Sequence, residues 1–295
     1  MLSRLKASVG LRDDKVYPQA PRSPASLELP RGRRGKALFG VLTIVEDELA
    51  VARAIFEMNH RISGSPYYVK SASSSNEYDV VIRRAADRGN LPAARATSEL
   101  IEDFRPMFIL LIGIAGGNSA VDGVAKGDIV VADFVDYSEF RKIAAGKDLK
   151  RNLPYDHPSL YLRENFVDHL RTDYDWSTLR DANRPVVGVT KVIIGNIVAG
   201  EKLLGDPDNP YQKEVLKTFD KAAAIDMESF GVARTVFEAR RSVQYNPQYL
   251  VIRGISDLVD VADEDNDEQR GLWKTCACTA AATFGKELVN AVISG

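Results

Sequence analysis

The chain has 295 residues, of which 45% are hydrophobic and 27% charged, as in an ordinary globular protein. Its formal net charge of -2 argues against a chain built wholly around nucleic acid, and no apolar run approaches the ~20 residues of a membrane span. Three histidines and two cysteines are too few for a zinc site to be expected, and we predict no metal and no cofactor. Because no apolar leader stands at the N-terminus, we expect a cytoplasmic protein.

The N-terminal segment differs from the rest of the chain in its composition and in its lack of apolar periodicity. The first 36 residues hold nine Lys or Arg against three acids, four prolines and no apolar periodicity. Residues 1–35 are therefore predicted to be a basic, flexible extension, which is either a linker or an arm that docks on another subunit or an anionic partner. The catalytic domain is predicted to span residues 36–295.

Beyond the extension, short apolar runs alternate with segments of helical periodicity. Residues 37–45 are apolar on both faces, as in a buried strand, and residues 46–59 repeat apolar residues at helical spacing after a first turn of acids. Residues 138–185 are polar and irregular. Further strands are predicted at 78–82, 107–114, 128–135, 186–194, 222–227 and 249–255, and helices at 92–104, 211–219, 228–240 and 268–292.

This alternation predicts a single α/β domain of three layers, with a central twisted mixed sheet flanked by helices. Cys276 and Cys278 fall in the last predicted helix. Side chains at i and i+2 of a helix do not face each other, so these cysteines are predicted to be buried and unpaired.

Four segments at the carboxyl ends of predicted strands carry groups that can do chemistry, and open α/β sheets place ligands there. Residues 45–48 contain three acids, which either stabilise a helix start or supply a catalytic base. Residues 113–117 hold glycines that either form a tight turn or let the backbone approach a flat or anionic ligand. They lack the G-x-G-x-x-G spacing of a dinucleotide site, which disfavours a Rossmann oxidoreductase.

The other two segments place carboxylates at later strand ends. Asp226 and Glu228 flank Met227 between a short strand and a helix. These acids either favour the helix start or bond the hydroxyls of a ribose, with the methionine packed on the sugar. Ser256 and Asp257 follow a strand, where such residues often cap a helix, but a carboxyl group there also suits a general acid.

In this order, the four segments resemble the nucleoside phosphorylase/nucleosidase superfamily. The similarity is strongest to its methylthioadenosine/S-adenosylhomocysteine nucleosidases and to related modules of signalling proteins, and it implies a nucleoside phosphorylase-like fold. It covers about residues 36–293. Each motif is weak alone, but the ordered set is specific: Gly89–Asn90 with Ala93–Ala94, Gly113 to Gly117 followed by Lys126 to Asp128, Gly195 to Glu201, Asp226 to Glu228, and Arg253 to Asp257.

The resemblance also implies roles for single residues. Asp257 would protonate the purine ring nitrogen as the base departs, Glu48 would activate water, and Glu228 would hold the ribose hydroxyls. Departure of the base leaves an oxocarbenium-like sugar, so an acid on the base side and a carboxylate on the sugar side both help. The remaining predicted binding residues are Met227 against the sugar, Ala115 and Gly116 along the base, and Ser256, Val198 and Leu203.

Two departures from the family pattern concern the substrate and the nucleophile. The family often stacks an aromatic residue on the purine, whereas this chain has Leu203 among aliphatic neighbours. Phosphorylases of the superfamily place an arginine for phosphate shortly before the glycines, whereas residues 110–112 are all apolar here. The second departure favours water over phosphate as the nucleophile.

The predicted function is hydrolysis of the N-glycosidic bond of a purine nucleoside or nucleotide, which releases free base and sugar. Phosphorolysis is the alternative activity, and a nucleotide-sensing module without turnover is the alternative from another class. The expected partner is the purine substrate, with no nucleic acid and no membrane, and the resemblance favours a homo-oligomer. The 5′ substituent is left open. Cations that would suit a phosphate there, or that otherwise form a solvated surface, are Arg88, Arg141, Lys142, Arg151 and Lys202.

Overall fold

The computed structural model describes residues 34–70, 77–144, 147–176, 179, 184–240, 244–261 and 266–295. The predicted basic extension lies outside these residues except for its last two, so it stays a prediction. Arg34 already joins the folded domain, because its backbone N–H donates to the carbonyl oxygen of Asp103 over 3.0 Å. Within the described ranges, no helix is long and apolar enough to cross a membrane.

A mixed sheet forms the frame of the domain. In the described part of the chain it has nine strands in the order β10-β9-β6-β11-β5-β1-β4-β3-β2. Strand β5 pairs in parallel with β1 and β11, and β6 pairs in parallel with β9 but antiparallel with β11. The strands are β1 (Lys36–Thr43), β2 (His60–Arg61), β3 (Tyr68–Val69), β4 (Glu77–Arg84), β5 (Phe108–Gly117), β6 (Ile129–Tyr137), β9 (Val192–Ala199), β10 (Ala222–Asp226) and β11 (Gln248–Leu258).

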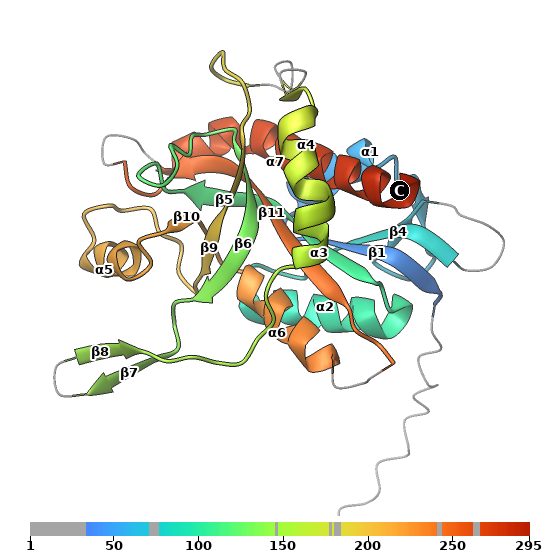
Figure 1. The fold of residues 1–295 in the computed structure, drawn as a ribbon, viewed down its shortest axis with the longest axis horizontal. Coiled ribbons are helices and arrows are strands. Elements are labelled where there is room, and N and C mark those ends of the chain that lie inside the picture. The colour runs from blue at the N-terminus through green and yellow to red at the C-terminus, as the bar shows by residue number, and fades with distance from the viewer. Residues whose placement is uncertain are drawn as a thin grey trace, which may run out of the picture. The chain divides into compact units, whose positions relative to one another are not determined.

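Helices cover both faces of the sheet, which confirms the predicted three layers (Figure 1). Helices α1 (Glu46–Ile55) and α7 (Asn266–Ser294) lie on one face, and α2 (Asn90–Phe104) and α6 (Ser229–Ala239) lie on the other. Each face has its own hydrophobic cluster because β1 and β5 are buried on both sides. Helix α7 also contains Cys276 and Cys278, which are buried and unpaired as predicted.

The glycines at the end of β5 do not form the tight turn that was one of the two expectations. Strand β5 runs on to Gly117, where Gly116 pairs with Asp257 of β11 on one side and Ile225 of β10 on the other. A Cβ on Gly116 would lie 2.6 Å from Cγ1 of Val259. Residue 116 is therefore glycine because Val259, directly after β11, packs closely against it. Asp257 of β11 lies beside the end of β5 through its pairing with Gly116.

The region from 138 to 185 contains structure that its polar, proline-containing sequence does not predict. It includes a hairpin of β7 (Arg141–Ala144) and β8 (Lys147–Lys150). It also includes the short helices α3 (Leu160–Leu162) and α4 (Asp168–Asp173), joined by a π-helical turn. The hairpin projects away from the central sheet (Figure 1).

The strand predicted at 186–194 was placed too early. Strand β9 begins at Val192, where it pairs with Ile129 of β6, and ends at Ala199. Val186 and Val187 are exposed instead. Apolar content suggested a strand over the whole run, but pairing with β6 decides where the strand begins. The shift brings the end of β9 close to Lys202 and Leu203. Helix α5 (Pro210–Thr218) follows as predicted.

Candidate active site

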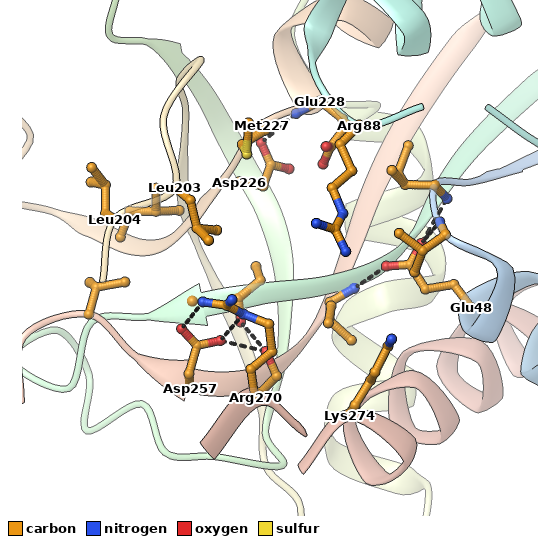
Figure 2. Close-up of a pocket in the computed structure, with 18 of the residues that line it drawn as sticks. Glu48, Arg88, Leu203, Leu204, Asp226, Met227, Glu228, Asp257, Arg270 and Lys274 are labelled. Atoms are coloured by element: carbon orange, nitrogen blue, oxygen red, sulfur yellow. Dashed lines mark hydrogen bonds and ion pairs between the residues drawn. The ribbon is translucent and has the colours of Figure 1, made fainter. Parts of the chain in front are cut away.

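A pocket opens at the carboxyl ends of the central strands (Figure 2). The segments after β1, β5 and β11 meet there because these strands are parallel neighbours, which end at the same edge of a sheet. Strand β10 pairs antiparallel with the end of β5 and brings residues 226–228 to the same place. Helices α1 and α7 and the segments after β4 and β9 complete its walls. The lining residues are Ile44, Val45, Glu48, Arg88, Ile114, Ala115, Gly116, Lys202, Leu203, Leu204, Ile225, Asp226, Met227, Glu228, Ser256, Asp257, Val259, Arg270 and Lys274.

Glu48 lies in the first turn of α1 and is held by backbone groups of two strand ends. One carboxylate oxygen accepts N–H bonds from Ile44 (2.7 Å) and Val45 (3.0 Å), and the other accepts one from Ile114 (2.9 Å). The first two bonds cap the helix, so the structural role expected of these acids is present. The third ties the same carboxylate to β5 and fixes its position at the wall of the pocket.

A buried cluster of two acids and one arginine lies at the start of α6, and its two acids line the pocket. Arg253 donates through Nε (2.9 Å) and Nη2 (2.7 Å) to one oxygen of Asp226, and through Nη2 to Glu228 (3.1 Å). The other oxygen of Glu228 accepts the backbone N–H of Gly89 over 3.0 Å. The side chain of Arg253 is 0% exposed, so the two acids are compensated inside the protein rather than by water.

These charged groups shift one another's pKa values. Burial raises the pKa of Glu228, and the nearby Asp226 raises it further, while Arg253 acts in the opposite direction. Burial by itself lowers the pKa of Arg253, but the surrounding carboxylates outweigh burial and the net pKa is raised. Arg253 therefore stays charged, and Glu228 holds a proton more readily than a glutamate in water does.

Glu48 and Arg253 approach each other across Gly113. A Cβ on Gly113 would collide with the Glu48 carboxylate and would lie 2.6 Å from Nη1 of Arg253. Nη1 is buried and has no hydrogen-bond partner among the described residues. Glycine at 113 therefore allows the Glu48 carboxylate and the Arg253 guanidinium to lie against the backbone of β5.

Asp257 lies at the other side of the pocket, near the end of β11. Its Oδ1 accepts a bond from the hydroxyl of Ser256 (2.6 Å), and Arg270 of α7 donates to Oδ1 (3.4 Å) and Oδ2 (3.2 Å). The Asp257 side chain is 2% exposed, whereas that of Arg270 is 21% exposed. The carboxylate is therefore nearly buried while its charge partner reaches solvent.

The pocket brings together eight of the nine predicted site residues. Asp257, Glu48, Glu228, Met227, Ala115, Gly116, Ser256 and Leu203 all line it. Leu203 is 60% exposed, and no aromatic side chain stands among the lining residues that the structure describes. The apolar surface on which a flat ring can rest is therefore aliphatic.

Val198 is the exception among the predicted binding residues, since it does not line the pocket. Its side chain is buried in a hydrophobic cluster with Leu204, Ile225 and Val259, all three of which do line it. Successive side chains of a strand point to opposite faces, so only part of β9 can face a ligand. Val198 supports the wall from behind.

Several residues in the pocket or directly behind its wall were not among the predicted ones. Asp226 and Arg253 belong to motifs quoted from the sequence, but nothing in the sequence says that they pair with each other. Arg270 lies in α7, and no sequence signal links it to Asp257. Lys202 and Arg88 were considered only as general candidates for phosphate, and their places in the pocket depend on the folding of the chain.

Comparison with known proteins agrees with this arrangement. Residues 39–292 match the family model described as the phosphorylase superfamily. The chain therefore belongs to the phosphorylase superfamily. Among curated relatives, the 5′-methylthioadenosine/S-adenosylhomocysteine nucleosidase of Shewanella loihica is 26% identical over 223 residues, which is 74% of this chain and 85% of that protein. The nucleosidase of Staphylococcus saprophyticus is 27% identical over 224 residues, 76% of this chain and 87% of the relative.

Solved structures show the same fold. The 5′-methylthioadenosine/S-adenosylhomocysteine nucleosidase of Neisseria meningitidis, in complex with methylthio-immucillin-A, superposes with a TM-score of 0.65 at 22% identity. This match covers 86% of our chain and 98% of that one. The futalosine hydrolase of Helicobacter pylori superposes with a TM-score of 0.64 at 17% identity, covering 86% and 97% of the two chains.

Proposed function

We propose that this protein hydrolyses the N-glycosidic bond of a purine nucleoside or nucleotide and releases the free base and the sugar. The observation that carries the proposal is that one pocket holds Glu48, Glu228 and Asp257, which come from three separate elements of the chain. The named activity of the curated relatives, nucleosidase, agrees with it.

At the base end, Asp257 is the proposed acid. Its carboxyl group gives a proton to a ring nitrogen of the purine while the bond between that base and the sugar C1′ breaks. The base then leaves as a neutral molecule. Ser256 positions the carboxyl group through its 2.6 Å hydrogen bond, and Leu203 supplies apolar contact for the ring.

At the sugar end, Glu228 is the proposed partner of the ribose hydroxyls, with Met227 packed on the sugar. The bonds from Gly89 and Arg253 hold the Glu228 carboxylate in place before a substrate enters. Positive charge develops on the sugar as the base leaves, so the fixed carboxylates of this wall stabilise the transition state more than the ground state.

The proposed nucleophile is water, activated by Glu48. The Glu48 carboxylate takes a proton from a water molecule while the oxygen of that water forms a bond to C1′. A phosphate dianion fits this place less well, because Glu48 would repel it and Arg253 is already shared by two acids. Residues 110–112, the position of the phosphate-binding arginine in phosphorylases, are buried and apolar.

The test is to incubate the protein with a panel of purine nucleosides and nucleotides, first without phosphate and then with it, and to identify base and sugar by chromatography. We expect free base and a reducing sugar at a rate that phosphate does not change. A rate that depends on phosphate and yields a sugar 1-phosphate would establish phosphorolysis instead. Tight binding without any release of base would establish a sensing module.

A further inference from the structure

Four cations line the pocket, and three of them are already paired with acids. Lys202 pairs with Glu139 over 2.9 Å, Arg270 pairs with Asp257, and Lys274 pairs with Asp47. Arg88 is the fourth. Its guanidinium has no hydrogen bond and no ion pair with any residue of the described chain, and Figure 2 shows it extending into the pocket.

Arg88 lies at the proposed sugar end of the pocket and not at the base end. It lies in the loop between β4 and α2, directly before Gly89, whose N–H bonds to Glu228 over 3.0 Å. Gly89 has a φ of 103°, a conformation that suits glycine and fixes the loop against this carboxylate. Figure 2 shows Arg88 on the Glu228 side of the pocket, whereas Leu203 and Asp257 lie on the opposite side.

On the proposed function, this arrangement orients the substrate. The base lies toward Asp257, and Glu228 takes the 2′ and 3′ hydroxyls of the ribose. The 5′ substituent is carried by C4′, which adjoins the carbon of the 3′ hydroxyl and lies at the end of the sugar away from the base. It therefore projects on the Glu228 side of the pocket, where Arg88 lies. Arg88 is therefore the charged group in reach of the 5′ end.

We propose that the substrate is a purine nucleoside with a phosphorylated 5′ position and that Arg88 is the residue that selects it. An arginine offers a planar fork of donors that matches phosphate, and it binds a dianion by charge-assisted bonds. A thioether or another apolar 5′ group would instead cover this guanidinium without giving it a partner, which costs binding energy. The inference rests on the proposed function. The proposed 5′-phosphate differs from the 5′-thioethers in the names of the curated relatives.

The test compares kcat/KM for adenosine 5′-monophosphate, adenosine and 5′-methylthioadenosine. We expect the wild-type protein to prefer the monophosphate. Arg88→Met keeps the length of the side chain and removes its charge. It should lower kcat/KM for the monophosphate by roughly 10- to 100-fold, the scale of a hydrogen bond to a charged group, and change the value for adenosine by less than about threefold.

The matched control is Arg171→Met, which removes an exposed charge on α4 that is not part of the pocket and should change none of the three values. Equal use of nucleoside and nucleotide by the wild-type protein would overturn the inference while leaving the proposed hydrolysis intact. An equal loss for all three compounds in Arg88→Met would also overturn it. If no compound releases base, the proposed function fails, and calorimetric Kd values for the same compounds and variants still decide the role of Arg88.

Discussion

The two ends of the pocket hold their carboxylates in different ways. At the sugar end, Asp226 and Glu228 share Arg253, whose side chain is 0% exposed. At the base end, Asp257 pairs with Arg270, whose side chain is 21% exposed and belongs to the first turns of α7. A fully buried arginine cannot exchange its partners for water, whereas a partly exposed one can withdraw into solvent.

This difference matches what each end is proposed to do. The sugar end must present fixed charge to a sugar that becomes positive, and a fixed network does this without reorganisation during the reaction. The base end must transfer a proton, so its carboxyl group has to change partners during each turnover. Changes at the sugar end should therefore act on folding as well as activity, and changes at the base end on activity alone.

The largest effect is expected from Arg253→Met. The substitution leaves the buried Asp226 and Glu228 without compensation, and breaking a buried ion pair in this way costs about 3–5 kcal/mol of unfolding free energy. Urea unfolding followed by circular dichroism measures the loss. The matched control is Arg95→Met on α2, where the side chain is 78% exposed and pairs with Glu99. That pair should contribute at most about 1 kcal/mol. Equal losses in the two variants would mean that the cluster is not a fixed element of the fold.

The next effect is expected from Asp257→Asn. The amide cannot donate the proton that the departing base needs, so kcat should fall by roughly 100-fold or more, the usual scale for a positioned acid. The unfolding midpoint should stay near that of the wild-type protein. Asp173→Asn changes a 73% exposed carboxylate and serves as the control. Near-normal turnover by folded Asp257→Asn would remove Asp257 from the proposed mechanism.

A smaller effect should appear in the pH dependence of stability. Because burial raises the pKa of Glu228 above 4.5, the folded state binds this proton more tightly than the unfolded chain does. The resulting stabilisation is fully present below pH 4.5 and is lost as the pH rises through the raised pKa, with a slope of at most about 1.4 kcal/mol per pH unit. Glu228→Gln should abolish this part of the slope.

The measurement is urea unfolding at several pH values between 4.5 and 7 for the wild-type protein, Glu228→Gln and the control Glu102→Gln, whose side chain is exposed on α2. The stability of Glu228→Gln relative to the wild-type protein should increase with pH, and that of the control should not. A parallel pH dependence in all three proteins would show that Glu228 does not titrate in this window.

The acids at both ends of the pocket lie close after strand ends, which is a feature that the sequence can predict. Strand ends can be predicted from apolar runs such as 107–114, and the candidate acids were sought directly after them. The resemblance to the superfamily then pointed to Glu48, Glu228 and Asp257 among these acids. The conformation of the glycines after residue 114 could not be predicted, because glycines suit a tight turn as well as a strand that continues against a close neighbour.

Pairing between side chains could not be predicted, because it depends on register and on helix placement. Asp226 and Arg253 are 27 residues apart and meet only because β10 and β11 both pair with β5. Arg270 reaches Asp257 only because α7 packs along β11: a Cβ on Gly254 would collide with the backbone of Ala277. Val198 lies behind the pocket wall for the same reason, since the neighbouring strands decide which side of β9 faces the pocket.

The smallest effect is expected from Arg270→Ala. If the substrate must displace Arg270 before Asp257 can reach the purine, removing the arginine lowers KM, by about fivefold or less if the pair contributes no more than ~1 kcal/mol. The unfolding free energy should change little, in contrast to Arg253→Met, because the side chain of Arg270 already reaches solvent. Arg270→Lys is the matched control, since it keeps the charge and should leave KM closer to the wild-type value. A rise in KM for Arg270→Ala would contradict this account, because it would show that Arg270 binds the substrate instead of competing with it. Arg270 would then be a fixed part of the base end, as Arg253 is of the sugar end.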